Sequence, residues 1–491
     1  MNNCTACSFV RVWGRSRLLP PERMQSVSAR EVAMKITYIE SGDFDDAVIA
    51  SSPKDYFLFK VLPVLTRSAV VGVVVGVLIT LFNLLLELSA DFAVIVGEEL
   101  QEHQKFIALY FVCMILIALF MAWFTKKIPE ARGSGIPRTE AMMCGKKEMK
   151  WWTMCFATVA GSCVSFIAGI PVGAEGPSVQ FGGGLGAGIE ECGRGRILSS
   201  KRYVANSGVA AGVAGAFIAP FTGILFVIEE VQRKFNPLML ASVCTSVMFA
   251  ISLRNGLGDA LGMKEIYFEA ATLSAVPDNF LWISLIAGIF AALAARLFNI
   301  SILATDNLSA KSRLPRFVPL VVLFVIVAVV NIFVPDNIGG GTVIINGILD
   351  GNYDWSRLLM LLAIKFCLVV MVFRAAPTGG MMVPMLALGA MLGALVGFIG
   401  VAAGMSTACV PVVALITMCA FFGSCIGAPL TVVALFAETT GRVDCLLSAV
   451  IAIFVSAIIS RLLKQPALYD TLWEREIHRD AMAFVKSSAT E

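Results

Sequence analysis

Charged residues are scarce in this chain of 491 residues: they make up 15% of it, whereas apolar residues make up 58%. Soluble globular proteins carry about 25% charged residues and roughly 45–50% apolar ones. So small a supply of charge cannot cover a water-facing surface, which excludes a cytosolic enzyme and a disordered regulator. The formal net charge of +3 is too small to indicate a nucleic acid or another polyanion as a partner.

Histidine is rarer still, since only His103 and His478 are present and both lie in polar stretches. This scarcity argues against a histidine zinc site, a haem or a serine protease in the membrane. The 13 cysteines are scattered, and the close pair Cys4 and Cys7 has no second pair to complete a metal site. We therefore expect a protein that is not an enzyme and that holds no metal or cofactor.

Long uncharged runs are abundant, and most approach the roughly 20 residues that cross a bilayer as a helix. They are 68–86, 106–125, 151–174, 203–228, 238–253, 280–295, 317–335 and 445–460. The range 375–437 holds no charged residue at all, but glycines and prolines interrupt it, so we expect several segments there. The sequence thus predicts an all-α polytopic membrane protein.

The charges that flank the first runs indicate an orientation. Lysines and arginines recur from Arg11 to Arg67, the next polar stretch is acidic, and the one after it is basic again. By the positive-inside bias, residues 1–55 form a cytoplasmic N-terminal segment, partly irregular and without a cleavable signal peptide. We expect a transmembrane domain over residues 56–473 in the inner or plasma membrane of the cell, and a short cytoplasmic tail over 474–491.

The chain also repeats itself weakly but in register. Two pairs of blocks match, one pair 207 positions apart and the other 209 apart. They are Gly173–Pro177 with Gly380–Pro384, and Ala219–Thr222 with Ala428–Thr431, the latter two followed by Glu229 and Glu438. Duplicated halves with glycine- and proline-interrupted segments are typical of transporters whose binding site lies at the membrane midplane. We therefore expect two halves, at about 60–254 and 280–463.

Three segments share one pattern, in which glycines precede a proline and an apolar helix. They are Gly133–Pro137, Gly173–Pro177 and Gly380–Pro384. Proline starts a helix without wasting a donor, and glycine lets the backbone approach a ligand. The first N–H groups of such helices need a partner in hydrocarbon, and an anion suits the positive end of the helix dipole. The alternative is that each motif is only a tight turn between packed helices.

At these motifs the chain resembles the CLC family of chloride channels and chloride/proton antiporters, whose anion-site motifs read GSGIP, GxEGP and GxFxP. The first two are complete here, and the third has Met382 where phenylalanine is usual. The resemblance runs from about Lys60 to Trp473. It implies a homodimer in which each subunit has its own pore, with two inverted halves of about 18 tilted, broken helices. It also implies a prokaryotic-type chain without C-terminal CBS domains.

The resemblance further implies a role for each motif residue. The central anion would be bound by the hydroxyl of Ser134, the phenol of Tyr469 and the N–H groups of Met381 and Met382. Gly133 and Gly135 would flank this site, and the helix starts would be built by Pro137, Gly173, Gly176, Pro177, Gly380 and Pro384. Glu175 would be the external gate, and Glu230 the inner proton acceptor that separates antiporters from channels.

The residues themselves support a role for Glu175. A charged side chain at the centre of a bilayer helix costs roughly 2.5–3.5 kcal/mol on insertion scales. The nearest basic residues along the chain are Lys150 and Arg194, so no sequence neighbour neutralises it. A carboxylate beside anion-binding amides competes with the anion when ionised and yields to it when protonated, which links the two occupancies. The alternative is a carboxylate that only caps its own helix.

Other residues have more ordinary interpretations. We expect Glu229 and Glu438 to be structural, with Glu438 paired with Arg442, and Lys365 and Arg374 to snorkel to the surface. Without the family pattern, Tyr469 would be an interfacial anchor, Ser134 a turn residue and Glu230 a solvated or salt-bridged helix end.

The sequence therefore predicts a secondary transporter that exchanges chloride or a similar monovalent anion for protons. The alternatives are a passive voltage- or proton-gated anion channel, which Glu230 argues against, and a fluoride/proton antiporter. Ser134 argues against fluoride, whereas Met382 leaves it open. Ala174 stands before Glu175 where a basic residue is common in the family, so the outer vestibule should attract anions less strongly. A cation transporter or membrane enzyme would need gathered carboxylates or a nucleophile with a base.

Overall fold

The chain divides into two units, Met1–Phe57 and Leu58–Glu491, and the account below concerns the second. The computed structural model describes residues 56–143, 150–192, 198–233, 235–263, 268, 270, 281–311, 314–315, 317–475 and 478–479. The predicted N-terminal segment with Cys4 and Cys7, and most of the predicted tail over 474–491, lie outside the described residues.

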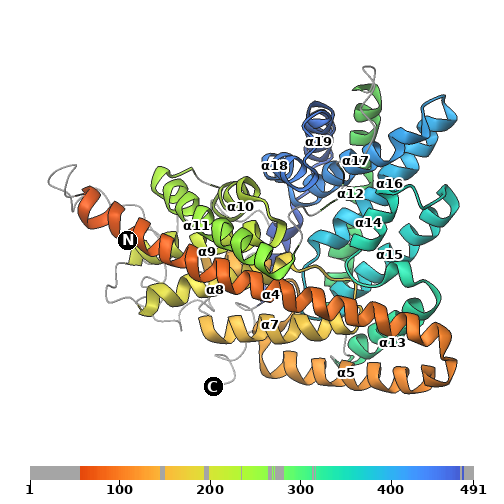
Figure 1. Ribbon diagram of the computed structural model, residues 1–491, viewed down its shortest axis with the longest axis horizontal. Coiled ribbons are helices and arrows are strands. Elements are labelled where there is room, and N and C mark those ends of the chain that lie inside the picture. Colours follow the sequence, from red (N-terminus) through yellow and green to blue (C-terminus); the bar gives the residue numbers. More distant parts are fainter. Residues whose placement is uncertain are drawn as a thin grey trace, which may run out of the picture. The chain divides into compact units, whose positions relative to one another are not determined.

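Every regular element in the described ranges is a helix, so the predicted all-α fold is confirmed (Figure 1). The first half holds α4 (Leu62–Glu102), α5 (Ile107–Lys127), α6 (Ile136–Met143), α7 (Trp151–Ile167), α8 (Glu175–Cys192), α9 (Leu198–Phe217), α10 (Pro220–Phe226) and α11 (Pro237–Leu261). The second holds α12 (Leu281–Lys311), α13 (Phe317–Phe333), α14 (Thr342–Leu349), α15 (Trp355–Ala375), α16 (Met382–Ala402), α17 (Val410–Ile426), α18 (Pro429–Thr440) and α19 (Leu446–Leu462).

Within the described residues, seven of these helical stretches are long and apolar enough to cross a membrane. They are α4, α5 with its preceding turn, α11, α12, α15, α16 and the stretch that contains α17. The chain is therefore an integral membrane protein. The charge-free range 375–437 does divide into several segments, namely α16, α17 and α18. The run 203–228 is also broken, because α9 ends at Phe217, Ile218 takes a φ of 57°, and Pro220 starts α10.

The repeat predicted from the sequence is a repeat of structure. In the first half, Gly182 and Gly186 of α8 lie against the backbone of α9. In the second, Gly389 and Gly393 of α16 lie against the backbone of α17 in the same way. A side chain at any of the four would overlap its neighbour, so glycine is what allows each pair of helices to pack closely. The matching glycines thus mark matching helix pairs.

Two glutamates cross-link the halves at the ends of short helices. Glu229 accepts hydrogen bonds from the N–H groups of Leu430 and Thr431, at 3.2 and 2.7 Å, and from the Thr431 hydroxyl at 2.8 Å. It therefore caps the N-terminus of α18, which satisfies unpaired donors and suits the positive end of the helix dipole. Its repeat partner does the same for α10.

Glu438 accepts hydrogen bonds from the N–H groups of Phe221 and Thr222 at 2.7 and 2.8 Å, and from the Thr222 hydroxyl at 2.8 Å. Both glutamates are structural, as predicted. The predicted pairing of Glu438 with Arg442 is wrong. Arg442 instead bonds to the carboxylate of Asp444, and the Glu438 carboxylate is taken up by the N-terminus of α10.

Removing one of these caps should weaken the fold. Each hydrogen bond to a charged group is worth roughly 1.5–3 kcal/mol when its loss leaves a donor unpaired. Glu438→Ala should therefore lower the Tm of the purified protein in detergent by several degrees. Glu98→Ala, which removes an exposed carboxylate from α4, is the matched control and should leave the Tm within a degree or so. If Glu438→Ala and Glu98→Ala had the same Tm, the capping role of Glu438 would be contradicted.

Candidate anion site

Two of the three predicted motifs meet at one backbone pairing. The N–H group of Gly173 donates to the carbonyl of Gly380, and the N–H group of Gly380 donates to the carbonyl of Gly173, both at 2.7 Å. Helix α8 begins two residues after Gly173, at Glu175, and α16 begins two residues after Gly380, at Met382. The pairing therefore places the N-terminal ends of α8 and α16 side by side.

The third motif joins the same place. The N–H group of Gly133 donates to the carbonyl of Ala376 at 3.2 Å, and the N–H group of Gly379 donates to the carbonyl of Gly133 at 3.2 Å. Gly133 and Gly135 both have positive φ angles, 76° and 79°, which glycine adopts without strain. This turn leads into α6, so all three predicted helix starts are brought together.

The motif glycines are needed because the backbones touch. A Cβ atom at Gly176 would overlap the carbonyl oxygen of Ser134 and would lie 2.9 Å from the Cα atom of Gly380. A Cβ atom at Gly380 would lie 2.7 Å from the nitrogen of Gly176. No residue larger than glycine fits at either position. The three motifs are therefore packed against one another, an arrangement that tight turns between packed helices would also give.

Glu175 lies inside this junction. It is the first residue of α8 and has none of its surface exposed. Its Oε2 atom lies against Gly173, since a Cβ atom there would overlap it, so the side chain folds back toward the start of its own helix. The carboxyl group thus occupies the junction where an anion and the three helix starts would meet.

The other predicted anion ligands lie at the starts of the same helices and differ in how deeply they are buried. Met381 and Met382 are buried at the start of α16, and Ser134 is half-buried in the turn before α6. Pro137, Pro177 and Pro384 lie in the first turns of α6, α8 and α16.

Tyr469 is fully buried, so its interpretation as an interfacial anchor is wrong. Within the described residues its hydroxyl has no hydrogen-bond partner. The carboxyl groups of Glu230, Glu140 and Glu175 all lie within electrostatic range of the phenol. The tyrosine hydroxyl is therefore available for a ligand, close to three carboxyl groups.

Glu230 is 3% exposed and belongs to the π-helical turn that follows α10, outside the seven candidate membrane spans. Burial and the nearby charge of Asp470 raise the pKa of Glu230 above its ordinary value, whereas Arg233 acts the other way. The Arg233 guanidinium lies 3.7 Å from the Glu230 carboxylate and also bonds to Asp470, the neighbour of Tyr469. Glu230 is thus a buried carboxyl group with a salt-bridge partner, and its interpretation as a solvated helix end is wrong.

The sequence alone did not point to two further buried charges. Glu140 of α6 is 3% exposed, and it lies within electrostatic range of Arg233 and Tyr469. The sequence feature that could have indicated Glu140 is its position three residues after Pro137, inside the helix that the first motif starts. Lys365 was expected to reach the membrane surface, but it has no exposed surface, so that expectation is wrong. Its Nζ atom donates to the backbone carbonyl groups of Asn337 and Gly339 instead of reaching water.

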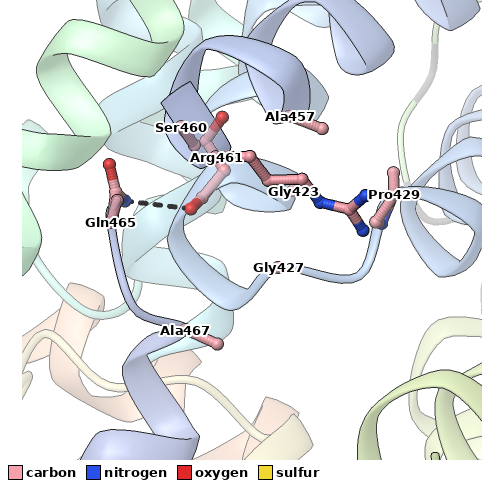
Figure 2. A pocket seen from close by; sticks show the side chains of 9 residues that line it. Gly423, Gly427, Pro429, Ala457, Ser460, Arg461, Gln465 and Ala467 are labelled. Carbon is pink, nitrogen blue, oxygen red and sulfur yellow. Dashed lines mark hydrogen bonds between the residues drawn. The ribbon is translucent and has the colours of Figure 1, made fainter. Parts of the chain in front are cut away.

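A cavity of about 180 Å³ lies elsewhere in the described part of the second half (Figure 2). It is lined by the end of α17, the start of α18, the end of α19 and the segment that leads to Tyr469. The lining residues include Gly427, Arg461 and Ala467. None of the three motifs contributes to its lining.

A methyl group at the junction should separate the helix starts. Gly176→Ala should lower the Tm and weaken binding of the predicted anion, chloride, at least about fivefold, because relieving such an overlap costs roughly 1–3 kcal/mol. Isothermal titration with chloride and thermal unfolding in detergent measure the two effects. Gly256→Ala is the control, since a Cβ atom at this exposed position in α11 meets nothing within 4 Å. Normal chloride binding by Gly176→Ala would contradict the junction's role.

Comparisons with known proteins agree with this architecture. A relative from Citrobacter koseri, the H(+)/Cl(-) exchange transporter ClcA, is 29% identical over 453 residues, which cover 87% of this chain and 91% of the relative. The ClcA of Salmonella arizonae is 28% identical over 447 residues, which cover 87% and 92% of the two chains.

Solved structures share the fold at lower sequence identity. A slow cyanobacterial Cl⁻/H⁺ antiporter matches with a TM-score of 0.78 and 22% identity, over 84% of this chain and 98% of that one. A CLC-type fluoride/proton antiporter matches with a TM-score of 0.68 and 19% identity, again over 84% and 98%. The family model described as voltage gated chloride channel matches residues 114–461, which shows that this chain belongs to that family, the CLC proteins.

Proposed function

We propose that this protein exchanges chloride, or a similar monovalent anion, for protons across the cell membrane. The observation that carries the proposal is the meeting of the three motif helix starts at the Gly173–Gly380 pairing. Several relatives that match most of the chain are named H(+)/Cl(-) exchange transporters, which supports chloride and protons as the two substrates.

The anion is bound by neutral dipoles. The N–H groups of Met381 and Met382, the hydroxyl of Ser134 and the phenol of Tyr469 supply the donors. Partial positive charge at converging helix ends attracts an anion without holding it as tightly as a full positive charge would. This moderate attraction is what passage requires, because an anion that is bound too strongly does not leave.

Glu175 couples the anion to the proton at the outer side. When its carboxylate is ionised, it takes the place of an anion at the helix starts; when it is protonated, it gives that place up. Its complete burial and its position against Gly173 support this competition. The proton on Glu175 and the anion therefore alternate at one position.

Glu230 receives protons from the inner side. Its buried carboxyl group has a raised pKa, so it holds a proton at pH values where an exposed glutamate is ionised. Arg233, which contacts it, is 43% exposed and connects the buried carboxyl group to the surface. A passive channel needs no such group, which is why we favour exchange over simple conduction.

Fluoride is the second candidate anion. The structural likeness to a CLC-type fluoride/proton antiporter is compatible with it, and Met382 departs from the chloride pattern. Ser134 favours chloride, because its hydroxyl completes the motif that the family's chloride site uses.

Liposomes that hold the purified protein test the exchange. A chloride gradient imposed without a proton gradient should drive protons uphill, recorded as a change in internal pH. Glu230→Gln should move chloride with little or no proton movement, because an amide cannot carry the proton. Glu229→Gln, which alters the adjacent structural carboxyl group, should keep the coupling.

Three outcomes would contradict parts of the proposal. Chloride flux with no proton movement in the parent protein would indicate a channel. Unchanged coupling in Glu230→Gln would exclude Glu230 as the proton acceptor. If fluoride were transported and chloride were not, the substrate would be fluoride.

The functional unit is a homodimer under this proposal. The adjoining helices α10, α11, α18 and α19 carry large exposed apolar side chains, among them Phe221, Met248, Leu430 and Leu447. Such a surface is suited to a second copy within the bilayer. Light scattering of the protein in mild detergent should give twice the mass of one chain after correction for detergent, whereas the mass of one chain would contradict the dimer.

A further inference from the structure

Lys365 carries a buried charge that the proposed exchange does not use. It lies in the middle of the buried stripe of α15, between Leu361 and Leu368, and has no exposed surface. An ammonium group removed from water is costly unless other charges or several hydrogen bonds compensate it. The groups that surround Lys365 therefore determine what its burial costs.

The described partners of Lys365 are neutral. Its Nζ atom donates to the carbonyl of Asn337 at 3.0 Å and to the carbonyl of Gly339 at 2.7 Å. Among the described residues, no carboxylate forms an ion pair with it. The side chain of Asn337 is 1% exposed, and neither its nitrogen nor its oxygen has a hydrogen-bond partner in the described part of the chain. The group thus lies in a polar but uncompensated environment.

A second positive feature adjoins the ammonium group. Helix α14 begins at Thr342 after Gly341, and no side chain caps this end of the helix. A Cβ atom at Gly341 would lie 3.3 Å from the Cε atom of Lys365, so the lysine reaches the start of α14. Carboxylates stabilise helix N-termini and cations oppose them. A buried lysine and a helix N-terminus without a side-chain cap lie at one place, and both favour a negative charge there.

The same loop contacts the motif junction. A Cβ atom at Gly340 would lie 2.9 Å from the carbonyl oxygen of Val172 and 3.0 Å from the side chain of Val383. Val172 precedes the paired Gly173, and Val383 lies in the first turn of α16. The loop to which Lys365 donates is therefore packed against the segment that precedes α8 and against the start of α16.

We propose that the Lys365 ammonium and the first N–H groups of α14 bind a small monovalent anion, at a position separate from the one formed by the three motifs. That this anion is the transported one rests on the proposed function. When protonated, Lys365, held by two carbonyl groups, raises the local anion concentration beside the junction. An anion bound at this position exchanges with the anion at the three-motif site.

Bromide locates such a site directly, because it replaces chloride and scatters X-rays anomalously. Crystals of the full chain grown in bromide should show an anomalous peak beside Lys365 Nζ and the start of α14. The peak should be lost in Lys365→Met and kept in Lys365→Arg, which preserves the charge. In liposomes, Lys365→Met should raise the KM for chloride about tenfold at unchanged proton-to-chloride ratio. Lys126→Met, at the exposed end of α5, should change neither.

No bromide peak at this place in the parent protein overturns the proposal, and Lys365 is then a neutral amine that braces the loop. This crystallographic result does not depend on whether Lys365→Met folds. It also does not depend on transport. A parent protein that moves no chloride but shows the peak contradicts the proposed function alone, whereas chloride exchange without the peak contradicts the Lys365 site alone.

Discussion

The reciprocal backbone pairing of Gly173 with Gly380 is the constraint on which the rest of the structure depends. A helix that starts inside a bilayer leaves its first N–H groups without water or an i−4 carbonyl. By pairing just ahead of α8 and α16, the two glycines satisfy their own backbone groups and leave the next donors of both helices at one place. Gly133 adds the start of α6. Gly176 and Gly380 must be glycine because the backbones are in contact there, and Gly133 and Gly135 adopt positive φ angles.

Buried charge separates structure from function in this protein. Glu229 and Glu438 are compensated by the helix ends that they cap, and Glu190 is compensated by Arg67 at 2.7 Å. The carboxylates of these residues connect different helices and find their partners within the fold. Glu230 has only a partial partner, and Lys365 has neutral carbonyl groups. Charges that the fold itself does not balance are the ones to which a mobile ion can respond.

Much of this could be predicted from the sequence because the signals are local. Glycine followed by proline marks each helix start, and the repeat of glycines at a constant offset marks matching helix pairs. The gathering of the motifs followed from their common chemistry. The partners of individual charges could not be predicted, since they depend on contacts between distant segments. Glu438 bonds to α10 rather than to Arg442 four residues away, and Lys365 is enclosed by a loop whose path no local pattern reveals. The positive φ of Ile218 could not be predicted either, although Pro220 two residues later marks the helix start that follows it.

The central claim is that one gate serves both anion and proton, so that neither moves without the other. The most direct measurement is the membrane potential at which net chloride flux through the reconstituted protein ceases, recorded at fixed chloride gradient while the pH gradient is varied. Coupled exchange predicts that this potential shifts steadily with the pH gradient. A potential set by the chloride gradient alone, at every pH gradient, would contradict the account.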